Sequence, residues 1–428
     1  MQHVKYPKQE TWGALLKRPT QTVSDIEETV EIIFKEVQKN GDATIRNFTK
    51  KFDQVEMESS AVTAEEISIA SNDVGAELKE AIILAKNNIE TFHKAQKTDR
   101  LNVETMDGVL CWQEKKPIQK VGLYIPGGTA PLFSTILMLA IPAKIAGCSD
   151  IVLCTPPNKD GKIDSAILYT AQLCGVTQIY KVGGIQAIAG MTFGTESIPK
   201  VYKIFGPGNQ FVTVAKQLAT KHGVAIDMPA GPSELLIVAD DSANPSFVAS
   251  DLLSQAEHGP DSQVVLVSTS KTLLDQVAAE VQSQLEDLPR KDIAKKAIAN
   301  SKLILMEDDQ QALELINSYG PEHFIICSEN ENFYVENILN AGSVFVGNFT
   351  PESAGDYASG TNHTLPTNGY AKQYSGVHLD SFMKSMTFQK ISERGILGIG
   401  NAIELMAEAE GLQAHKNAVT LRLKSLKS

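Results

Sequence analysis

The chain has 428 residues, of which 43% are hydrophobic and 21% charged, so it can build a core and is long enough for two or three domains. Its 39 basic and 51 acidic side chains give a formal charge of -12, and no cluster of Lys and Arg stands out, which argues against nucleic acid as a partner. The amino-terminal residues lack the pattern of a secretory signal, and the longest apolar stretch, 132–143, is too short to span a membrane. We therefore expect a soluble, cytoplasmic protein with no membrane partner.

The cysteine pattern also favours a cytoplasmic protein. None of them forms a C-x-x-C pair, and most lie among apolar neighbours, as in IVLCT and FIICS. We expect small, buried hydrophobic residues in a reducing compartment. The five residues are Cys111, Cys148, Cys154, Cys174 and Cys327.

The first hundred residues have helical periodicity. A capping box at Ser24–Glu27 begins one helix, and Gly41 is expected to end it. Two apolar faces have the spacing of a helix: Ile26, Val30, Ile33, Phe34 and Val37, and then Leu78, Ile82, Ala85, Ile89 and Phe92.

From Val121 onward, short apolar runs rich in branched residues alternate with longer amphipathic stretches, which predicts parallel strands covered by helices. The alternation starts again at ELLIVA, residues 234–239, so two sheets in series are expected. A polar loop at 349–376 is too long to be a simple connector and is expected to be functional. From Ser381 the chain is expected to be helical.

The fold class is therefore α/β, with two doubly wound, incomplete Rossmann-like parallel-sheet domains, an N-terminal helical arm and a small C-terminal helical domain. The expected boundaries are 1–22 for the arm, 23–123 with 234–376 for the first α/β domain, 124–233 for the second, and 377–428 for the C-terminal domain.

Three glycine-containing loops follow strands of the predicted 124–233 domain, where free backbone N–H groups could receive a phosphate. None completes the dinucleotide pattern G-x-G-x-x-G, because Phe211 occupies the third glycine position. Each loop alone is equally well explained by turn geometry, but three on one sheet favour a dinucleotide. The glycines are Gly127 with Gly128, Gly183 with Gly184, and Gly206 with Gly208.

The segment LLSQAEHGP, residues 252–260, ends an amphipathic stretch on polar residues. Gln255 and His258 are three residues apart, so on a helix both can point at one spot, which Gly259 would leave open. Asp356 and His415 are possible further ligands, but the separations give no local metal signature. A histidine that only caps the helix remains the alternative reading.

Glu322 and His323 directly precede the apolar run FIICS. Adjacent residues in a strand project to opposite faces, so both can act together only if the strand has not yet begun. They could then form a general base pair, and the alternative is a solvated Glu beside a partly buried His.

Three stretches together closely resemble the histidinol dehydrogenase family, and the likeness extends over essentially the whole chain. They are IDMPAGPSELLIVADDSANPSFVASDLLSQAEHG at 226–259, GPEHF at 320–324 and AEGLQAHKNAV at 409–419. The resemblance implies a zinc-dependent homodimer that oxidises L-histidinol to L-histidine, the last step of histidine biosynthesis. It also implies two hydride transfers to two NAD+ molecules through a bound L-histidinaldehyde.

The same resemblance assigns the site residues by position. The zinc ion, one per subunit, would be held by Gln255, His258, Asp356 and His415. His323 would be the base for the alcohol proton, and Glu322 would activate the water that hydrates the aldehyde. The substrate would also contact Ser233, His363 and Glu410, with the zinc ligands and His323, while NAD+ would contact Tyr124, Gln186 and Asn209.

Glu410 and His415 are separated by about 140° on an ideal helix, so they can converge only if Gly411 breaks it. The resemblance implies that these residues come from the other subunit, so the C-terminal domain would take part in dimerisation. Three rival functions remain at this stage. They are a cysteine-dependent aldehyde dehydrogenase acting through Cys111 or Cys148, a two-lobed binding protein, and a metal-dependent hydrolase.

Overall fold

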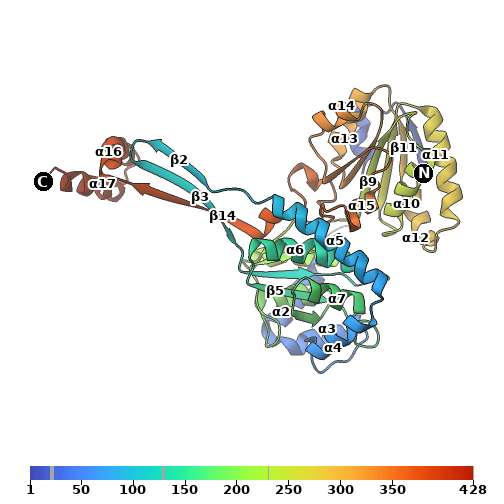
Figure 1. The fold of residues 1–428 in the computed structure, drawn as a ribbon, viewed down its shortest axis with the longest axis horizontal. Coiled ribbons are helices and arrows are strands. Elements are labelled where there is room, and N and C mark those ends of the chain that lie inside the picture. Colours follow the sequence, from blue (N-terminus) through green and yellow to red (C-terminus); the bar gives the residue numbers. More distant parts are fainter. Residues whose placement is uncertain (20–23, 128–130, 230, 428) are drawn as a thin grey trace. The chain divides into compact units, whose positions relative to one another are not determined.

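The computed structural model describes residues 1–19, 24–127, 131–229 and 231–427. It falls into two compact units. Unit 1 consists of Met1–Gln96 and Ile118–Phe382, and unit 2 of Lys97–Pro117 and Met383–Ser428 (Figure 1). Within the described residues, no helix combines the length and the apolar character that crossing a membrane requires.

The first sheet of unit 1 is parallel and has six strands in the order β1-β11-β10-β9-β12-β13. They are β1 (Gln2–Lys5), β9 (Glu234–Ala239), β10 (Gln263–Ser268), β11 (Lys302–Leu305), β12 (His323–Cys327) and β13 (Ser343–Val346). From β9 the chain winds one way to β10 and β11 and then the other way to β12 and β13, which is the doubly wound topology predicted from the sequence.

The amino-terminal arm differs from the helical arm that was expected. It begins with strand β1, which pairs along β11, and continues into the short helices η1 (Gln9–Thr11) and α1 (Trp12–Leu15). A four-residue strand carries little periodicity of its own. It forms because the edge of β11 offers unpaired backbone groups.

Both faces of this sheet are covered, as parallel sheets require. Along β9, Leu235 and Ile237 enter one hydrophobic core, and Leu236 and Val238 enter the other. The helices associated with this sheet are α10 (Pro245–Ala256), α11 (Lys271–Leu285), α12 (Lys291–Ala299), α13 (Asp309–Tyr319), α14 (Glu331–Asn337) and α15 (Glu352–Tyr357).

The second parallel sheet has five strands in the order β6-β5-β4-β7-β8 and is also doubly wound. Its strands are β4 (Lys120–Tyr124), β5 (Asp150–Thr155), β6 (Gln178–Lys181), β7 (Lys203–Phe205) and β8 (Ala225–Ile226). Its helices are α6 (Phe133–Ala146), α7 (Ser165–Leu173), α8 (Gly184–Phe193) and α9 (Gln210–Lys221). The predicted α/β class with two such sheets is confirmed.

The helices of the first hundred residues are α2 (Ser24–Asn40), α3 (Asp42–Phe52), α4 (Ala64–Asp73) and α5 (Ala76–Ala95). All five apolar residues predicted for the face of α2 are buried, and Gly41, with φ of 54°, follows its last residue. The side chains of Ser24 and Asp25 lie outside the described residues. On α5 the predicted face is buried only in its middle, because Leu78 and Phe92 are exposed.

The packing of these helices corrects the expected domain boundary at residue 123. Helix α2 packs on α8 and α9, and α4 packs on α7, so these helices cover the five-stranded sheet and not the six-stranded sheet. Val30 and Phe34 share a hydrophobic core with Val152 and Ile188. Periodicity identified the apolar face of α2 correctly, but it contains no information on which sheet that face meets.

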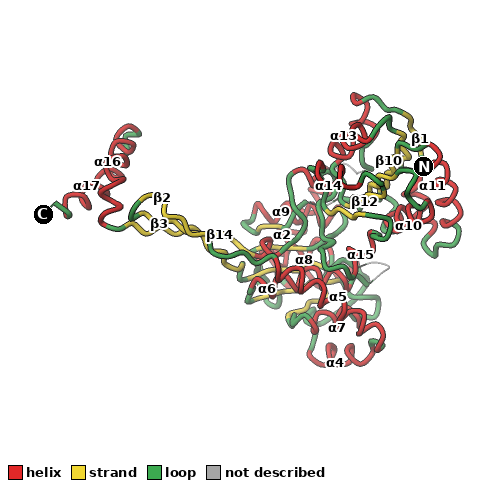
Figure 2. Tube along the Cα trace, turned by 45° about the horizontal axis from the view of Figure 1, so that its top comes forward, coloured by secondary structure: helices red, strands yellow, loops and turns green. Residues whose placement is uncertain are grey.

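Unit 2 combines a three-stranded antiparallel sheet with two helices, and Figure 2 distinguishes its strands from its helices by colour. They are β2 (Leu101–Met106), β3 (Val109–Pro117), β14 (Met383–Ile391), α16 (Glu393–Ala409) and α17 (Gln413–Ser425). The all-helical C-terminal domain was therefore wrong at β14. This strand forms because β3, far away in the sequence, supplies its hydrogen-bond partners and because Trp112 stacks on Phe388 with ring centroids 5.1 Å apart.

Candidate active site

Glu322 and His323 meet at the amino-terminal edge of the six-stranded sheet. His323 is the first residue of β12, opposite Leu235 of β9, and Glu322 lies just before the strand begins. Both side chains are buried, and His323 Nδ1 lies 3.7 Å from Glu322 Oε2. The condition set by the sequence analysis is met, because Glu322 precedes the strand and its side chain can turn toward that of His323.

The main chain of Glu234 fixes both groups. Its N–H donates to Glu322 Oε2 at 2.8 Å, and its carbonyl oxygen lies 3.2 Å from His323 Nδ1. Since a carbonyl can only accept, Nδ1 carries a proton, and Nε2 is the ring atom free for chemistry. Nε2 is buried, has no hydrogen-bond partner among the described residues and lies 3.6 Å from Asp356 Oδ1.

Three carboxylates surround this imidazole. Burial would lower the pKa of His323, but Glu322, Glu352 and Asp356 together raise it to about 10. Burial also raises the pKa of Glu322 and that of Glu352, each to about 8. Carboxyl groups crowded in one buried place are costly to ionise, and a cation there, either the imidazolium or a bound metal ion, stabilises their charged forms.

Glu352 is the site residue that the sequence analysis missed. It is the first residue of α15, is 1% exposed, and lies 3.7 Å from His323 Nδ1. Single ligand atoms of His323, Glu352 and Asp356 all lie within 4.8 Å of one another. A signal was present, because Glu352 and Asp356 are four residues apart and therefore share one face of the helix that follows Pro351.

Gln255 lies in the last turn of α10 and is fully buried. With its amide nitrogen turned toward Glu352, it donates to Glu352 Oε2 at 3.1 Å, and its oxygen accepts from the Glu234 N–H at 3.1 Å. This pairing gives the Gln255 amide one orientation, and it joins Gln255 to the same cluster as His323.

His258 lies in the turn after α10, because the helix ends at Ala256 and not at Gly259 as expected. The turn still follows the helical path, since the His258 N–H donates to the Gln255 carbonyl at 3.3 Å. His258 is exposed as a whole residue, although burial of its ring lowers the pKa of the imidazole, and the Asp356 carboxylate interacts electrostatically with both His258 and His323. Of the four expected metal ligands, Asp356 lies in the cluster with His323 and Glu352, and Gln255 joins that cluster through Glu352, whereas His258 is linked to it only by electrostatic interaction.

His363 and Ser233, two of the expected substrate contacts, form hydrogen bonds within the chain. His363 Nδ1 donates to the Asp356 carbonyl at 2.8 Å, and its Nε2 lies 3.1 Å from Thr135 Oγ1. Both nitrogens of His363 are therefore occupied within the chain, which suits a residue that positions Asp356. Ser233 directly precedes β9 and is half-buried, and its carbonyl accepts from the Gln263 N–H.

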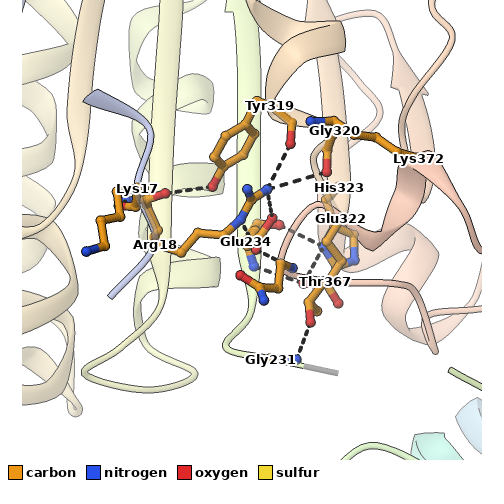
Figure 3. Close-up of polar contacts among 12 residues, drawn as sticks. Lys17, Arg18, Gly231, Glu234, Tyr319, Gly320, Glu322, His323, Thr367 and Lys372 are labelled. Carbon is orange, nitrogen blue, oxygen red and sulfur yellow. Dashed lines mark hydrogen bonds and ion pairs between the residues drawn. The ribbon is translucent and has the colours of Figure 1, made fainter. Parts of the chain in front are cut away.

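Glu234 also anchors the amino-terminal arm through its side chain, as Figure 3 shows. Arg18 forms two hydrogen bonds with the Glu234 carboxylate, of 2.5 and 2.8 Å, and its guanidinium lies 4.0 Å from the centre of the Tyr319 ring. The Asn368 N–H donates to the same carboxylate at 2.5 Å. One residue thus ties the arm, the long polar loop and the acid–imidazole pair together.

A separate cavity of about 610 Å³ lies at the carboxyl-terminal edge of the five-stranded sheet. Its lining includes Tyr124, Gln186 and Asn209, which are all the positions expected to contact NAD+. The Tyr124 hydroxyl accepts from the Gly184 N–H at 3.0 Å, and burial raises its pKa to about 12. Asn209 caps α9 by accepting from the Val212 N–H at 3.1 Å.

The glycine loops around this cavity have a structural explanation as well. Gly206, with φ of 125°, lies directly against the Tyr124 carbonyl, and a Cβ on Gly183 would lie 2.5 Å from that of Pro156. Gly206 and Gly183 allow close approach of backbone segments, and Gly127 and Gly184 of these loops line the cavity. Gly128 lies outside the described residues.

Glu410 and His415, the remaining expected residues, belong to unit 2, and both are exposed. Helix α16 ends just before Glu410, Gly411 has a φ of 73°, and α17 begins at Gln413. The chain therefore breaks its helical path at Gly411, which is the condition under which Glu410 and His415 could converge.

Comparisons with known proteins agree with this geometry. The family model described as histidinol dehydrogenase matches residues 16–423. A histidinol dehydrogenase of Bacteroides fragilis (strain YCH46) is 60% identical over 427 residues, which is 100% of both chains, and that of Escherichia coli (strain K12) is 54% identical over 416 residues, 96% of this chain and 95% of its own. A crystal structure of histidinol dehydrogenase from Elizabethkingia anophelis has a TM-score of 0.98 at 55% identity, covering 100% of this chain and 99% of its own. The chain therefore belongs to the histidinol dehydrogenase family.

Proposed function

We propose that this chain oxidises L-histidinol to L-histidine in two steps, with two NAD+ molecules as hydride acceptors and L-histidinaldehyde held between the steps. Overall, the alcohol, one water and two NAD+ give the carboxylate, two NADH and three protons. The observation that carries the proposal is the buried pair Glu322 and His323, held by the Glu234 main chain beside Asp356. The proposed reaction takes place in the cytoplasm, where free thiols such as those of Cys154 and Cys174 are ordinary.

In the first step, His323 Nε2 takes the proton of the substrate hydroxyl group. At the same time, hydride leaves the carbon that bears this hydroxyl and moves to the nicotinamide. The Nδ1–H of His323 continues to donate to the Glu234 carbonyl oxygen, so the ring can gain a proton on Nε2 without turning. In the second step, Glu322 takes a proton from water as that water adds to the aldehyde. The hydrate then loses its hydride to a second NAD+, and its protons leave through the same pair.

The proposed zinc ion would bind Gln255, His258 and Asp356 of one chain, together with His415 of a second copy. Nitrogen and oxygen donors beside a cluster of carboxylates fit this ion. When bound, the ion would hold the imidazole and amine of the substrate. Its charge would also oppose protonation of His323, and this would leave the imidazole as the base that the first step requires.

The homodimer is part of the proposal because Glu410 and His415 would complete the site of the other subunit. Unit 2 supports this with exposed apolar residues on several of its elements, which is typical of an interaction surface. They include Leu101, Val103, Met386, Leu397, Leu405, Met406 and Leu421.

The direct test uses the purified protein with L-histidinol and NAD+. We expect two NADH per histidine formed, loss of activity with a zinc chelator and recovery when zinc is added. No NADH, or one NADH with accumulation of aldehyde, would contradict the proposed reaction. A metal-dependent hydrolase or a binding protein would form no NADH.

The cysteine-dependent alternative is tested by Cys148→Ser and Cys111→Ser. Cys148 is buried, and burial raises the pKa of its thiol to about 11, whereas Cys111 belongs to unit 2. A buried thiol with so high a pKa is poorly suited to act as a nucleophile. We expect both variants to form histidine at close to the normal rate, and loss of the second step alone in either would support the alternative.

Sharing of residues between subunits is tested by mixing two inactive variants, His323→Asn and His415→Asn. If His415 serves the neighbouring copy, a hybrid dimer has one intact site, so random exchange of subunits should restore about a quarter of the activity. Mixing two preparations of His323→Asn is the control and should restore none. Failure of the first mixture, with subunit exchange verified, would contradict the shared site.

A further inference from the structure

Asp53 is a carboxylate that the proposed reaction does not use. It ends α3 as the C-cap residue and lines the 610 Å³ cavity. Its Oδ2 atom is buried and has no hydrogen-bond partner among the described residues. Burial raises the pKa of Asp53 to about 6, so the protein itself supplies little to stabilise the charge.

Two further polar atoms of the cavity lining share this property. Gln186 Oε1 and Thr155 Oγ1 are buried without a hydrogen-bond partner in the described part of the chain, and each residue is 1% exposed. A carboxylate and an amide oxygen can only accept hydrogen bonds, so the cavity suits a ligand that brings donors. Sugar hydroxyls are such donors, whereas a phosphate dianion is not.

The position of Asp53 along the sheet indicates which part of a dinucleotide it would meet. In doubly wound sheets the diphosphate lies over the first strand, here β4, and the adenosine lies toward the second and third strands, here β5 and β6. The residues that come after Asp53 in the chain lie on the β5 and β6 side of the sheet. Val55 packs at Gly161 in the loop after β5, and Ala61 bridges to Tyr180 of β6.

In dinucleotide-binding folds an acidic residue near the end of the second strand binds the adenosine ribose. Strand β5 ends at Thr155 and is followed by Pro156 and Pro157, so the strand end has no carboxylate. Asp164 also lines the cavity, but its Oδ1 caps α7 by accepting from the Ala166 N–H at 2.8 Å. Asp53 reaches the same side of the sheet from α3, a helix outside the β–α units.

We propose that Asp53 is the residue that selects NAD+ over NADP+, by accepting hydrogen bonds from the hydroxyl groups of the adenosine ribose. The inference rests on the proposed use of a nicotinamide dinucleotide and adds a specificity determinant to that site. A 2′-phosphate removes the hydroxyl donor and brings negative charge against the carboxylate. The cation in the described lining, Lys162, is exposed and remains free to attract a phosphate once Asp53 is neutral.

The test compares Asp53→Asn with Asp160→Asn, which removes the same charge from an exposed position in the loop after β5. For Asp53→Asn we expect KM for NAD+ to rise roughly tenfold with kcat nearly unchanged, and the preference for NAD+ over NADP+ to fall roughly 10- to 100-fold. Asp160→Asn should change neither value. An unchanged preference in folded Asp53→Asn would overturn the inference.

Binding measured without histidinol separates this inference from the proposed reaction. Calorimetry with ADP-ribose and with its 2′-phosphate should show that the wild type discriminates between them and that Asp53→Asn does not. If histidinol is not oxidised but this discrimination depends on Asp53, the proposed reaction fails alone. If histidinol is oxidised normally and the discrimination does not depend on Asp53, the inference fails alone.

Discussion

The two parallel sheets of unit 1 have the same doubly wound topology, yet they carry their candidate sites on opposite edges. The cavity of the five-stranded sheet lies at the carboxyl-terminal edge, where Tyr124 ends β4 and Asn209 follows β7. The acid–imidazole pair of the six-stranded sheet lies at the amino-terminal edge, where β9 and β12 begin. Topology alone would have directed attention to the carboxyl-terminal edge of both sheets.

The difference lies in which edge leaves polar groups unsatisfied. At the carboxyl-terminal edge of the six-stranded sheet, Asp240 is satisfied by hydrogen bonds from the chain itself, including the Ser328 hydroxyl at 2.7 Å and the Glu329 N–H at 2.9 Å. At the amino-terminal edge, His323 Nε2 has no such partner among the described residues, and three carboxylates crowd around it. A candidate site is therefore better located by unsatisfied buried groups than by strand direction.

The largest expected effect follows from removing either member of the pair at the amino-terminal edge. His323→Asn and Glu322→Gln should each lower kcat by roughly two to four orders of magnitude, because a proton transfer loses its acceptor. Zinc content and histidinol binding should stay close to normal, as measured by metal analysis and calorimetry. Loss of zinc in either variant would move that residue from catalysis to coordination.

Asp240→Asn is the matched control at the opposite edge of the same sheet. It removes a half-buried carboxylate that accepts several hydrogen bonds, so some loss of stability is expected, but kcat per folded molecule should remain within about twofold. A large loss of kcat in Asp240→Asn would show that both edges of this sheet serve the reaction.

The next largest effect concerns the buried ion pair between Arg18 and Glu234, which lies at the amino-terminal edge of the six-stranded sheet. Arg18→Met leaves the Glu234 carboxylate, 1% exposed, without its cation and should destabilise the protein by about 3–5 kcal/mol. Lys35→Met breaks an exposed ion pair with Glu31 and should cost about 0.5 kcal/mol or less. Urea unfolding of both variants measures the contrast, and similar losses would mean that the buried pair adds nothing beyond a surface contact.

The sequence could predict the two sheets and many of the helices, because apolar periodicity is a local property. Burial of Val30 and Phe34 followed from their spacing, but the sheet on which α2 packs did not, since apolar faces are interchangeable. Strand β14 was missed because its partner β3 lies far away in the sequence. Long-range pairing is the physical information that a local pattern lacks.

For the candidate site too, local spacing predicted some residues and long-range packing determined the others. From spacing and residue type, Gln255 with His258 and Glu322 with His323 could be identified as possible pairs, and the family resemblance supplied their roles. Glu352 was overlooked because nothing in its neighbourhood indicates that its carboxylate is buried against His323. A side chain that acts only through contacts from another element cannot be recognised until the elements are packed.

The contacts of Glu352 allow two roles, either to orient the zinc ligand Gln255 or to bind zinc directly. As the acceptor that orients the Gln255 amide, it predicts that Glu352→Gln weakens zinc affinity by roughly 10- to 100-fold, less than His258→Asn does. Competition with a chelator of known affinity measures both variants. Complete loss of zinc binding in Glu352→Gln would instead make Glu352 a direct ligand beside Asp356.

The smallest expected effect belongs to the cavity edge of the five-stranded sheet and depends on pH. The pKa of Asp53 is about 6 in the folded protein and lies above its ordinary value of 3.8, so the charged form is disfavoured by folding. The cost is fully present above pH 6 and disappears as the pH falls toward 4, where the group is protonated in both states. Asp53→Asn should therefore be more stable than the wild type at pH 8, by about 1 kcal/mol or less because water screens part of this side chain, and the gain should vanish near pH 4. Thermal unfolding at both pH values checks this, and a variant that is less stable at pH 8 would show that the carboxylate has a stabilising partner in the free protein.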